Sequence, residues 1–294
     1  SRDNNLKLKY GFSIGNQIDM KFSDFMSLIY QDKSIEVLGL YVEGFAEGDA
    51  CAISKLIKNY RAEKRHVVIY KGGRSERGKA AAEGHTGAMT GDYQLQKRLL
   101  SKSGAIFVET FNQFNAVFKW LTAFPDKKHL GKVSIVTNAG YETVGSMDIL
   151  GDTHSSKLYN LSASDEKALN KVLTNNQLSN LVSATNPLDL TPMAGEKAYF
   201  ECVEAMINFG SDVVLLGLVP LTNQLDTEEM NRAKVFAAQL KSLANQHNCA
   251  IGIILDVGLS FQGYKKVFED ENLPVFDSMD MAVLGVNILS SKQI

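Results

Sequence analysis

The sequence predicts an α/β fold with doubly wound, mostly parallel sheets, and two observations support this prediction. Short apolar runs rich in β-branched residues recur along the 294 residues. They do not alternate strictly with polar residues, which is typical of strands that are covered on both faces. Amphipathic stretches separate these runs. Strand and helix therefore alternate along the chain, as they do where parallel strands are joined by right-handed crossovers.

The apolar runs and the stretches between them define the expected elements in order. We expect buried strands at residues 37–42, 66–71, 105–108, 132–137, 212–219, 249–257 and 273–276. Shorter runs at 11–15 and 181–184 are interpreted as two further strands. Apolar residues recur with helical spacing at 49–63, 93–103, 110–123, 141–150, 164–174, 196–208, 226–246, 260–271 and 278–290.

A polar segment, PDKKHLGK at 125–132, interrupts the alternation and has the Pro and Gly content of a linker. The alternation restarts after it. We therefore expect two domains, residues 1–127 and 128–294, each built on a flavodoxin-like plan. The first opens with the polar stretch SRDNNLKLKY, where a doubly wound domain normally opens with an apolar strand. We expect that the chain begins inside a domain.

Composition excludes several classes of function. The net charge is -2 and no basic stripe is present, which argues against a nucleic-acid-binding face. No apolar run has the length of a membrane span, and the first residues do not have the pattern of a signal peptide. Cys51, Cys202 and Cys249 are far apart and lie in apolar patterns, so we expect core residues in a reducing cytoplasm rather than disulfides or a zinc site.

In open α/β sheets, ligands bind at the carboxyl ends of the strands, so the residues that follow each strand are candidates for chemistry. Glu43 and Gly44 follow the run at 37–42. The segment GGRS follows the run at 66–71, and NPLD follows the run at 181–184. Asn138, Ala139 and Gly140 follow the run at 132–137 and open a helix, whose N-terminus would favour an anion. Small residues at such a turn also serve packing alone.

His85 lies in the small-residue segment EGHTGAMTGD, between Gly84 and Gly87. We interpret this segment as a loop that leaves the imidazole accessible. A carboxylate such as Glu43 that accepts from one ring nitrogen fixes the tautomer and leaves the other nitrogen nucleophilic. This arrangement suits a histidine that carries a phosphoryl group. The alternative is a loop histidine whose hydrogen bonds go to the backbone.

The other candidate residues have simpler interpretations. Arg74 would pair with phosphate or with a surface carboxylate, and Lys71 and Lys79 are interpreted as solubilising charges. Trp120 lies on an apolar helix face and is expected in the core. The sequence contains no GxxxxGK[ST] or GxGxxG motif, which argues against a P-loop or a dinucleotide site.

Five motifs together resemble the middle domains of NDP-forming acyl-CoA synthetases. This family includes ADP-forming acetyl-CoA synthetase and is similar to succinyl-CoA synthetase. The resemblance covers nearly the whole chain. Its motifs are SIGNQIDM (13–20), LYVEG (40–44), YKGGRSERGKAAAEGHTGAMTG (70–91), SIVTNAGYETVGSMDIL (134–150) and NPLDL (186–190).

The resemblance implies an acid–CoA ligase in which a histidine carries phosphate from an acyl phosphate to ADP. By motif position, His85 matches the phosphohistidine and Glu43 the carboxylate that orients it. The resemblance assigns phosphate binding to Gly84, Thr86, Gly87 and Ala88 of the histidine loop, and to Asn138, Ala139 and Gly140 at the tip of a helix. No metal ligand is assigned to this chain.

The family also implies partners that the motifs do not include. These are a CoA-binding domain and ATP-grasp domains that bind nucleotide and Mg²⁺, in the same full-length chain or in other subunits of an oligomer. Gly84 stands where the family commonly has Ser. Two alternatives stay open: a non-catalytic module that binds a metabolite or a partner, and an acyl- or carbamoyl-transfer relative. The residues select neither the acid nor ADP over GDP.

Overall fold

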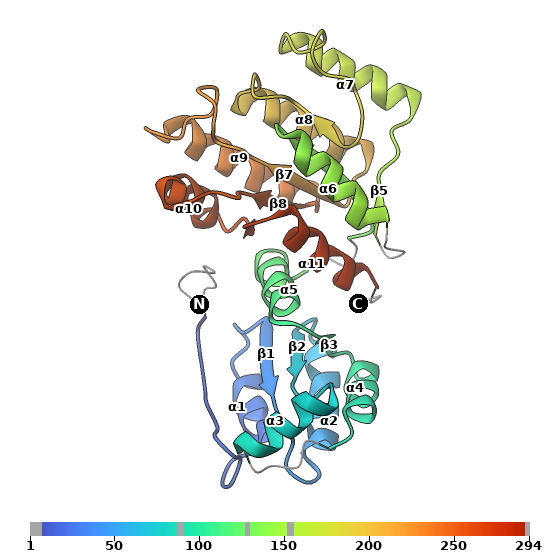
Figure 1. Ribbon diagram of the computed structural model, residues 1–294, viewed down its shortest axis with the longest axis vertical. Helices are drawn as coiled ribbons and strands as arrows, with labels where there is room; N and C mark the ends of the chain where they lie inside the picture. Colours follow the sequence, from blue (N-terminus) through green and yellow to red (C-terminus); the bar gives the residue numbers. More distant parts are fainter. Residues whose placement is uncertain (1–7, 87–90, 127–129, 152–155, 292–294) are drawn as a thin grey trace. The chain divides into compact units, whose positions relative to one another are not determined.

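The computed structural model describes residues 8–86, 91–126, 130–151 and 156–291. The chain divides into two compact units, Ser1–Asp126 and Lys127–Ile294, which we call unit 1 and unit 2 (Figure 1). Each unit is an α/β structure whose strand pairs are all parallel within the described residues. The predicted fold class, flavodoxin-like doubly wound units with mostly parallel sheets, is confirmed.

Unit 1 contains a sheet of β1 (Val37–Val42), β2 (His66–Lys71) and β3 (Ile106–Val108), in that order. Val37 lies opposite His66, and Val68 lies opposite Ile106. The apolar runs predicted these three strands. The parallel pairing brings their carboxyl ends to one edge of the sheet.

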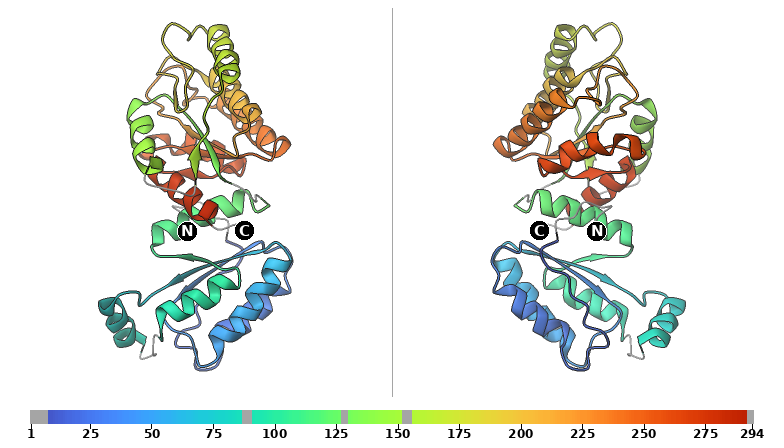
Figure 2. Two further views of the ribbon diagram at one scale, coloured as in Figure 1. Left: turned by 90° about the vertical axis from the view of Figure 1, so that its right-hand side faces the viewer. Right: turned by 90° about the vertical axis from the view of Figure 1, so that its left-hand side faces the viewer.

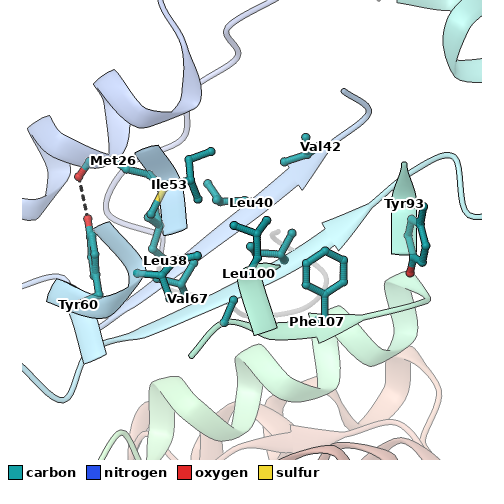
Figure 3. Close-up of a cluster of buried hydrophobic side chains, with 13 residues drawn as sticks. Met26, Leu38, Leu40, Val42, Ile53, Tyr60, Val67, Tyr93, Leu100 and Phe107 are labelled. Carbon is teal, nitrogen blue, oxygen red and sulfur yellow. Dashed lines mark hydrogen bonds between the residues drawn. The ribbon is translucent and has the colours of Figure 1, made fainter. Parts of the chain in front are cut away.

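One face of this sheet is covered by α1 (Phe22–Tyr30), α2 (Asp49–Ala62) and α4 (Tyr93–Lys102). Figure 3 shows the resulting core, in which Leu38, Leu40 and Val42 of β1 point toward the helices. The Tyr60 hydroxyl of α2 donates to the carbonyl of Met26 in α1 at 3.0 Å. Burying these side chains is the main stabilisation of unit 1, at about 25 cal/mol per Å² of apolar surface.

The other face of the sheet is covered by α5 (Phe111–Ala123), as Figure 2 shows. The Thr110 hydroxyl caps this helix by accepting from the Gln113 amide at 3.1 Å. The helix approaches β1 closely at Gly39, where an added Cβ would lie 2.5 Å from Phe118. Trp120 is 1% exposed, so its predicted core position is confirmed.

Unit 2 contains a six-stranded sheet. Five of its strands lie side by side in the order β5 (Lys157–Leu158), β4 (Lys132–Thr137), β7 (Val213–Gly217), β8 (Ala250–Ile254) and β9 (Val275–Phe276). The sixth strand, β6 (Leu188–Asp189), pairs with the carboxyl end of β4. Strands β5 and β6 share one edge of β4, because β7 occupies the other.

Helices cover both faces of this sheet, as in a doubly wound unit. On one face α6 (Gly140–Gly151) packs with α11 (Met279–Ser291), and on the other lie α8 (Glu196–Phe209) and α9 (Asn231–Gln246) (Figure 2). Next to these, α7 (Ala163–Asn175) packs on α8, and α10 (Gln262–Asp270) on α9. The 3-10 turn η1 (Leu259–Phe261) leads into α10.

Several predicted elements are wrong in detail. Residues 11–15 and 181–184 form no strand, and the pairing near the second run is made instead by β6 within NPLDL. The helix predicted to begin at 226 begins at Asn231, because the Asp226 carboxylate accepts from the Met230 and Arg232 amides and forms a turn there. Cys51 is exposed, whereas Cys202 and Cys249 are buried as predicted.

Candidate functional site

Glu43 follows β1 directly, at the edge where the three strands of unit 1 end. The Gly72 amide donates to the Val42 carbonyl at 2.8 Å and extends the pairing of β1 and β2 to this point. A Cβ added at Gly72 would lie 3.8 Å from Cγ of Glu43. The carboxylate stem therefore lies against the glycine that follows β2.

The carboxylate of Glu43 accepts a hydrogen bond from the Tyr41 hydroxyl at 2.8 Å. The Tyr41 ring stacks on Tyr70 and on Phe111, with ring centroids 5.7 Å and 5.8 Å apart. Desolvation of the hydroxyl, and then its hydrogen bond to Glu43, raise the pKa of Tyr41 to about 12. The hydroxyl therefore remains a donor at neutral pH.

Lys71, the last residue of β2, is buried with 2% of its surface exposed, so its interpretation as a solubilising charge is wrong. Its ammonium donates to the carbonyl of Glu43 at 2.7 Å and to the carbonyl of Gly72 at 3.0 Å. Burial lowers the pKa of Lys71 to about 8, although the nearby Glu43 carboxylate opposes this shift. No local pattern indicates this burial, because a Lys at a strand end is usually solvated.

Arg74 pairs with a carboxylate, which was one of the two partners that the sequence left open. Its guanidinium lies 2.7 Å from one oxygen of Glu109, and the Lys97 ammonium lies 2.7 Å from the other. The hydrogen bond from Lys97 and the charges of both cations hold the pKa of Glu109 below its usual value. Glu109 follows β3, so these charges lie at the same sheet edge as Glu43.

The segment that carries His85 is helical, which corrects the predicted loop. The helix α3 (Glu76–Thr86) runs through Gly84 and His85 and ends at Thr86. For His85 and Thr86 the description covers the backbone, and Gly87 and Ala88 lie outside the described residues. The glycines suggested a loop, but the run of alanines at 80–82 favours a helix and Gly84 is tolerated within its last turn. A Cβ added at Gly84 would meet nothing within 4 Å.

In unit 2, Asn138, Ala139 and Gly140 form the turn between β4 and α6. The Asn138 side chain donates to the Val219 carbonyl at 3.0 Å and accepts from the Val219 amide at 2.9 Å. The Ala139 amide donates to the Thr137 hydroxyl at 3.2 Å. The Asn138 side chain thus joins the turn to the segment after β7.

The sequence analysis did not single out Glu142, in the first turn of α6. This side chain is 4% exposed and accepts a short hydrogen bond from the Thr137 hydroxyl. Burial, with smaller contributions from the Asp256 and Asp189 carboxylates, raises the pKa of Glu142 to about 7, although the bond from Thr137 opposes the shift. A Cβ on Gly217 would collide with Glu142, so the glycine makes room for it. A strand-end Thr five residues before an acidic helix residue is the signal that sequence reasoning could have used.

Asn186 belongs to a motif that sequence reasoning placed at a strand end. Its side chain bonds to the edge of β4, accepting from the Ile135 amide at 2.9 Å and donating to the Val133 carbonyl at 3.1 Å. It also donates to the Tyr159 carbonyl at 2.9 Å. These contacts give Asn186 a structural role between β4, β5 and β6.

Over residues 8–86, 91–126, 130–151 and 156–291, no group of three or more His, Cys, Asp or Glu side chains is arranged to hold a metal ion. Among the helices of the same residues, none is long and apolar enough to cross a membrane.

The fold defines an α/β protein of the flavodoxin-like kind. Comparison with known proteins shows which proteins of this kind the chain is similar to. Residues 1–121 match the family model described as succinyl-CoA ligase like flavodoxin domain. The chain is 23% identical over 266 residues to the alpha subunit of ADP-forming acetate–CoA ligase II of Pyrococcus furiosus, covering 90% of this chain and 55% of that subunit. It is 36% identical over 140 residues to the ADP-forming 4-hydroxybutyrate–CoA ligase of Nitrosopumilus maritimus, covering 46% of this chain and 19% of that enzyme.

A solved structure shows the same fold. The dinucleotide forming acetyl-coenzyme A synthetase 1 of Ca. Korarchaeum cryptofilum, in complex with phosphate and ADP, aligns with a TM-score of 0.76 at 19% identity. The alignment covers 98% of this chain and 59% of that one. The chain therefore spans about half the length of this structure and of the Pyrococcus subunit.

Residues 1–121 thus match the succinyl-CoA ligase like flavodoxin domain, and the chain is similar in sequence over most of its length to an ADP-forming acetate–CoA ligase subunit. The relationship inferred from the five motifs is confirmed.

Proposed function

We propose that this chain is the phosphoryl-transfer part of an NDP-forming acid–CoA ligase and that His85 carries the phosphoryl group. The overall reaction is acyl-CoA + phosphate + ADP ⇌ acid + CoA + ATP. The observation that carries the proposal is the anchored carboxylate of Glu43 at a sheet edge of the domain that the family model matches. The names of the related ligases support the reaction class.

The proposed chemistry proceeds in three balanced steps. Phosphate first displaces CoA from acyl-CoA and forms an acyl phosphate. A ring nitrogen of His85 then attacks phosphorus, so that an N–P bond forms and the P–O bond to the acid breaks, releasing the carboxylate. Finally an oxygen of ADP attacks phosphorus, the N–P bond breaks, and ATP leaves with neutral imidazole restored.

Glu43 would act on the second ring nitrogen. The phosphorylated ring carries positive charge, and a carboxylate that accepts its N–H stabilises that charge and fixes the reactive tautomer. Phosphoryl transfer depends mainly on such positioning and charge compensation. We place Gly84, Thr86, Gly87 and Ala88 around the phosphoryl group.

The start of α6 is the second phosphate-binding element of the proposal. We propose that Asn138, Ala139 and Gly140 bind the anion through backbone N–H groups and the partial positive charge of the helix N-terminus. The hydrogen bonds between Asn138 and Val219 support this, because they hold the backbone of the turn in one conformation.

The proposal requires groups that other parts of the enzyme supply. We assign CoA, nucleotide and Mg²⁺ to CoA-binding and ATP-grasp domains, in the same full-length chain or in partner subunits of an oligomer in the cytoplasm. One relative is named as an alpha subunit, and the chain covers 55% of it, which supports an assembly of several parts.

The test is phosphorylation of the complete enzyme with labelled ATP and Mg²⁺. We expect an acid-labile, base-stable label that is absent in His85→Asn and retained in His247→Asn, a matched change at an exposed histidine after α9. If the label persists in His85→Asn, another residue is the carrier. If the complete enzyme takes no label, the chain is a non-catalytic module.

A further inference from the structure

Lys71 is an unusual residue for the place it occupies. Its side chain is 2% exposed, and its ammonium donates to two neutral acceptors, the carbonyls of Glu43 and Gly72. Burying a charge is unfavourable unless hydrogen bonds or an opposite charge compensate for it. A Met side chain would fill similar volume without that cost, so packing alone does not account for the ammonium.

The ammonium joins two chain segments at the point where strand pairing ends. Glu43 follows β1 and Gly72 follows β2, and the two strands are already paired from Val37 opposite His66 to Val42 opposite Lys71. The contact therefore adds little to the sheet itself. It fixes the position of the Glu43 backbone beyond the last strand pair.

Tyr41 also contacts Glu43, at its carboxylate rather than at its backbone carbonyl. Its hydroxyl donates to the Glu43 carboxylate at 2.8 Å, and its ring is held by the stack with Tyr70 and Phe111. A solvated turn glutamate would sample many rotamers, and ordering such a side chain costs free energy. Here its backbone and its carboxylate are each held by a separate donor.

We propose that Lys71 and Tyr41 are positioning residues that together orient Glu43 for the phosphoryl-transfer step. Lys71 sets the carbonyl and Tyr41 sets the carboxylate, so that the carboxylate is in place before the histidine is phosphorylated. This inference rests on the proposed function. Preorganisation of this kind raises the rate because no reorganisation is needed at the moment of reaction.

The test uses the complete enzyme and measures the single-turnover rate of His85 labelling at saturating ATP. Tyr41→Phe removes one hydroxyl, and Lys71→Met removes the ammonium together with both of its hydrogen bonds to backbone carbonyls. We expect Tyr41→Phe to slow labelling about 10-fold, the size expected for the loss of one hydrogen bond to a charged group, and Lys71→Met to slow it by at least as much, because it loses two. The matched controls, Tyr70→Phe in the same stack and Lys58→Met on the exposed side of α2, should label at the unaltered rate.

A second measurement separates positioning from a merely structural role. If both residues act through Glu43, then Tyr41→Phe and Lys71→Met should cause no further loss when added to Glu43→Gln. Losses that multiply in that background would overturn the inference. Should Lys71→Met fail to fold, Tyr41→Phe decides by itself, because the isosteric ring keeps its stack.

The outcomes also distinguish this inference from the proposed function. An unaltered enzyme that takes no label contradicts the proposed function and removes the basis of the inference. If the enzyme labels, Glu43→Gln slows it, and Tyr41→Phe and Lys71→Met match their controls, then the inference alone is wrong. A Glu43→Gln enzyme with an unaltered rate would remove Glu43 and both positioning residues from the mechanism, while the phosphohistidine would stand.

Discussion

The buried carboxyl group of Glu142 should make the stability of unit 2 depend on pH. Burial raises its pKa from 4.5 to about 7, so the folded protein holds this proton over a range in which the unfolded chain has released it. The stabilisation from the neutral acid is fully present below pH 4.5, and it is lost as the pH rises through 7. Glu142→Gln keeps a neutral side chain that can accept from Thr137 at every pH.

The size of the change in unfolding free energy follows from the pKa shift of Glu142. Each pKa unit corresponds to about 1.4 kcal/mol, so Glu142→Gln should gain about 3 kcal/mol relative to the unaltered protein at pH 8 and about 1 kcal/mol at pH 5.5. The difference between the two variants should therefore grow by about 2 kcal/mol between these pH values.

Urea unfolding followed by hydrogen exchange of peptides from β4 and β7 measures the difference in unfolding free energy between the two proteins, and it does so for unit 2 alone. Glu228→Gln changes an exposed acid in the same unit and should leave the difference near zero at both pH values. A Glu142→Gln effect of equal size at pH 5.5 and pH 8 would mean that the acid is not protonated in the folded protein, and the reasoning would be wrong.

Three further changes test the packing of the two units. Gly39→Ala places a methyl group 2.5 Å from Phe118 and should destabilise unit 1 by about 1–3 kcal/mol. Trp120 fluorescence in a urea titration measures this loss, and unchanged stability would show that α5 shifts freely. Gly84→Ala adds a methyl group that meets nothing within 4 Å, so it should stabilise α3 by about 0.5–1 kcal/mol. The expected result is slower hydrogen exchange in α3, and faster exchange would contradict the helical assignment. Asn186→Ala removes the acceptor of the Ile135 amide, while the Val133 carbonyl still accepts from the Tyr159 amide at 2.8 Å. It should lower the stability of unit 2 by about 1–3 kcal/mol in a urea titration, and a loss below about 0.5 kcal/mol would show that water replaces the side chain.

The fold could be predicted from the sequence because hydrophobic burial determines it. Runs such as 37–42 and 213–217 are apolar along their whole length, and such runs become parallel strands covered on both faces. Short segments were harder to predict. The two-residue strand β6 has no periodicity, and α1 lacks a strong start signal because Lys21 precedes it. The helix α3 was missed because its glycines outweighed its alanines in the interpretation.

The candidate site was predictable only in part. Glu43 follows a strand and His85 follows a run of small residues, so their positions in the sequence identify them as candidates. The roles of Lys71 and Glu142 depend on burial by residues distant in the sequence, which no local pattern records. The side chain of Asn138 bonds with Val219 across the end of the sheet, which no local pattern records, and its contact with an anion through the backbone stays a prediction.

The central claim is that phosphate on His85 is an intermediate on the path to ATP, and a chase experiment tests it most directly. The complete enzyme would be incubated with acyl-CoA and labelled phosphate without ADP, and the labelled protein would then be isolated and mixed with ADP. We predict one label per site on a peptide containing His85, and quantitative transfer of that label to ATP faster than steady-state turnover. A label that stays on the protein, or that forms equally in His85→Asn, would contradict the claim.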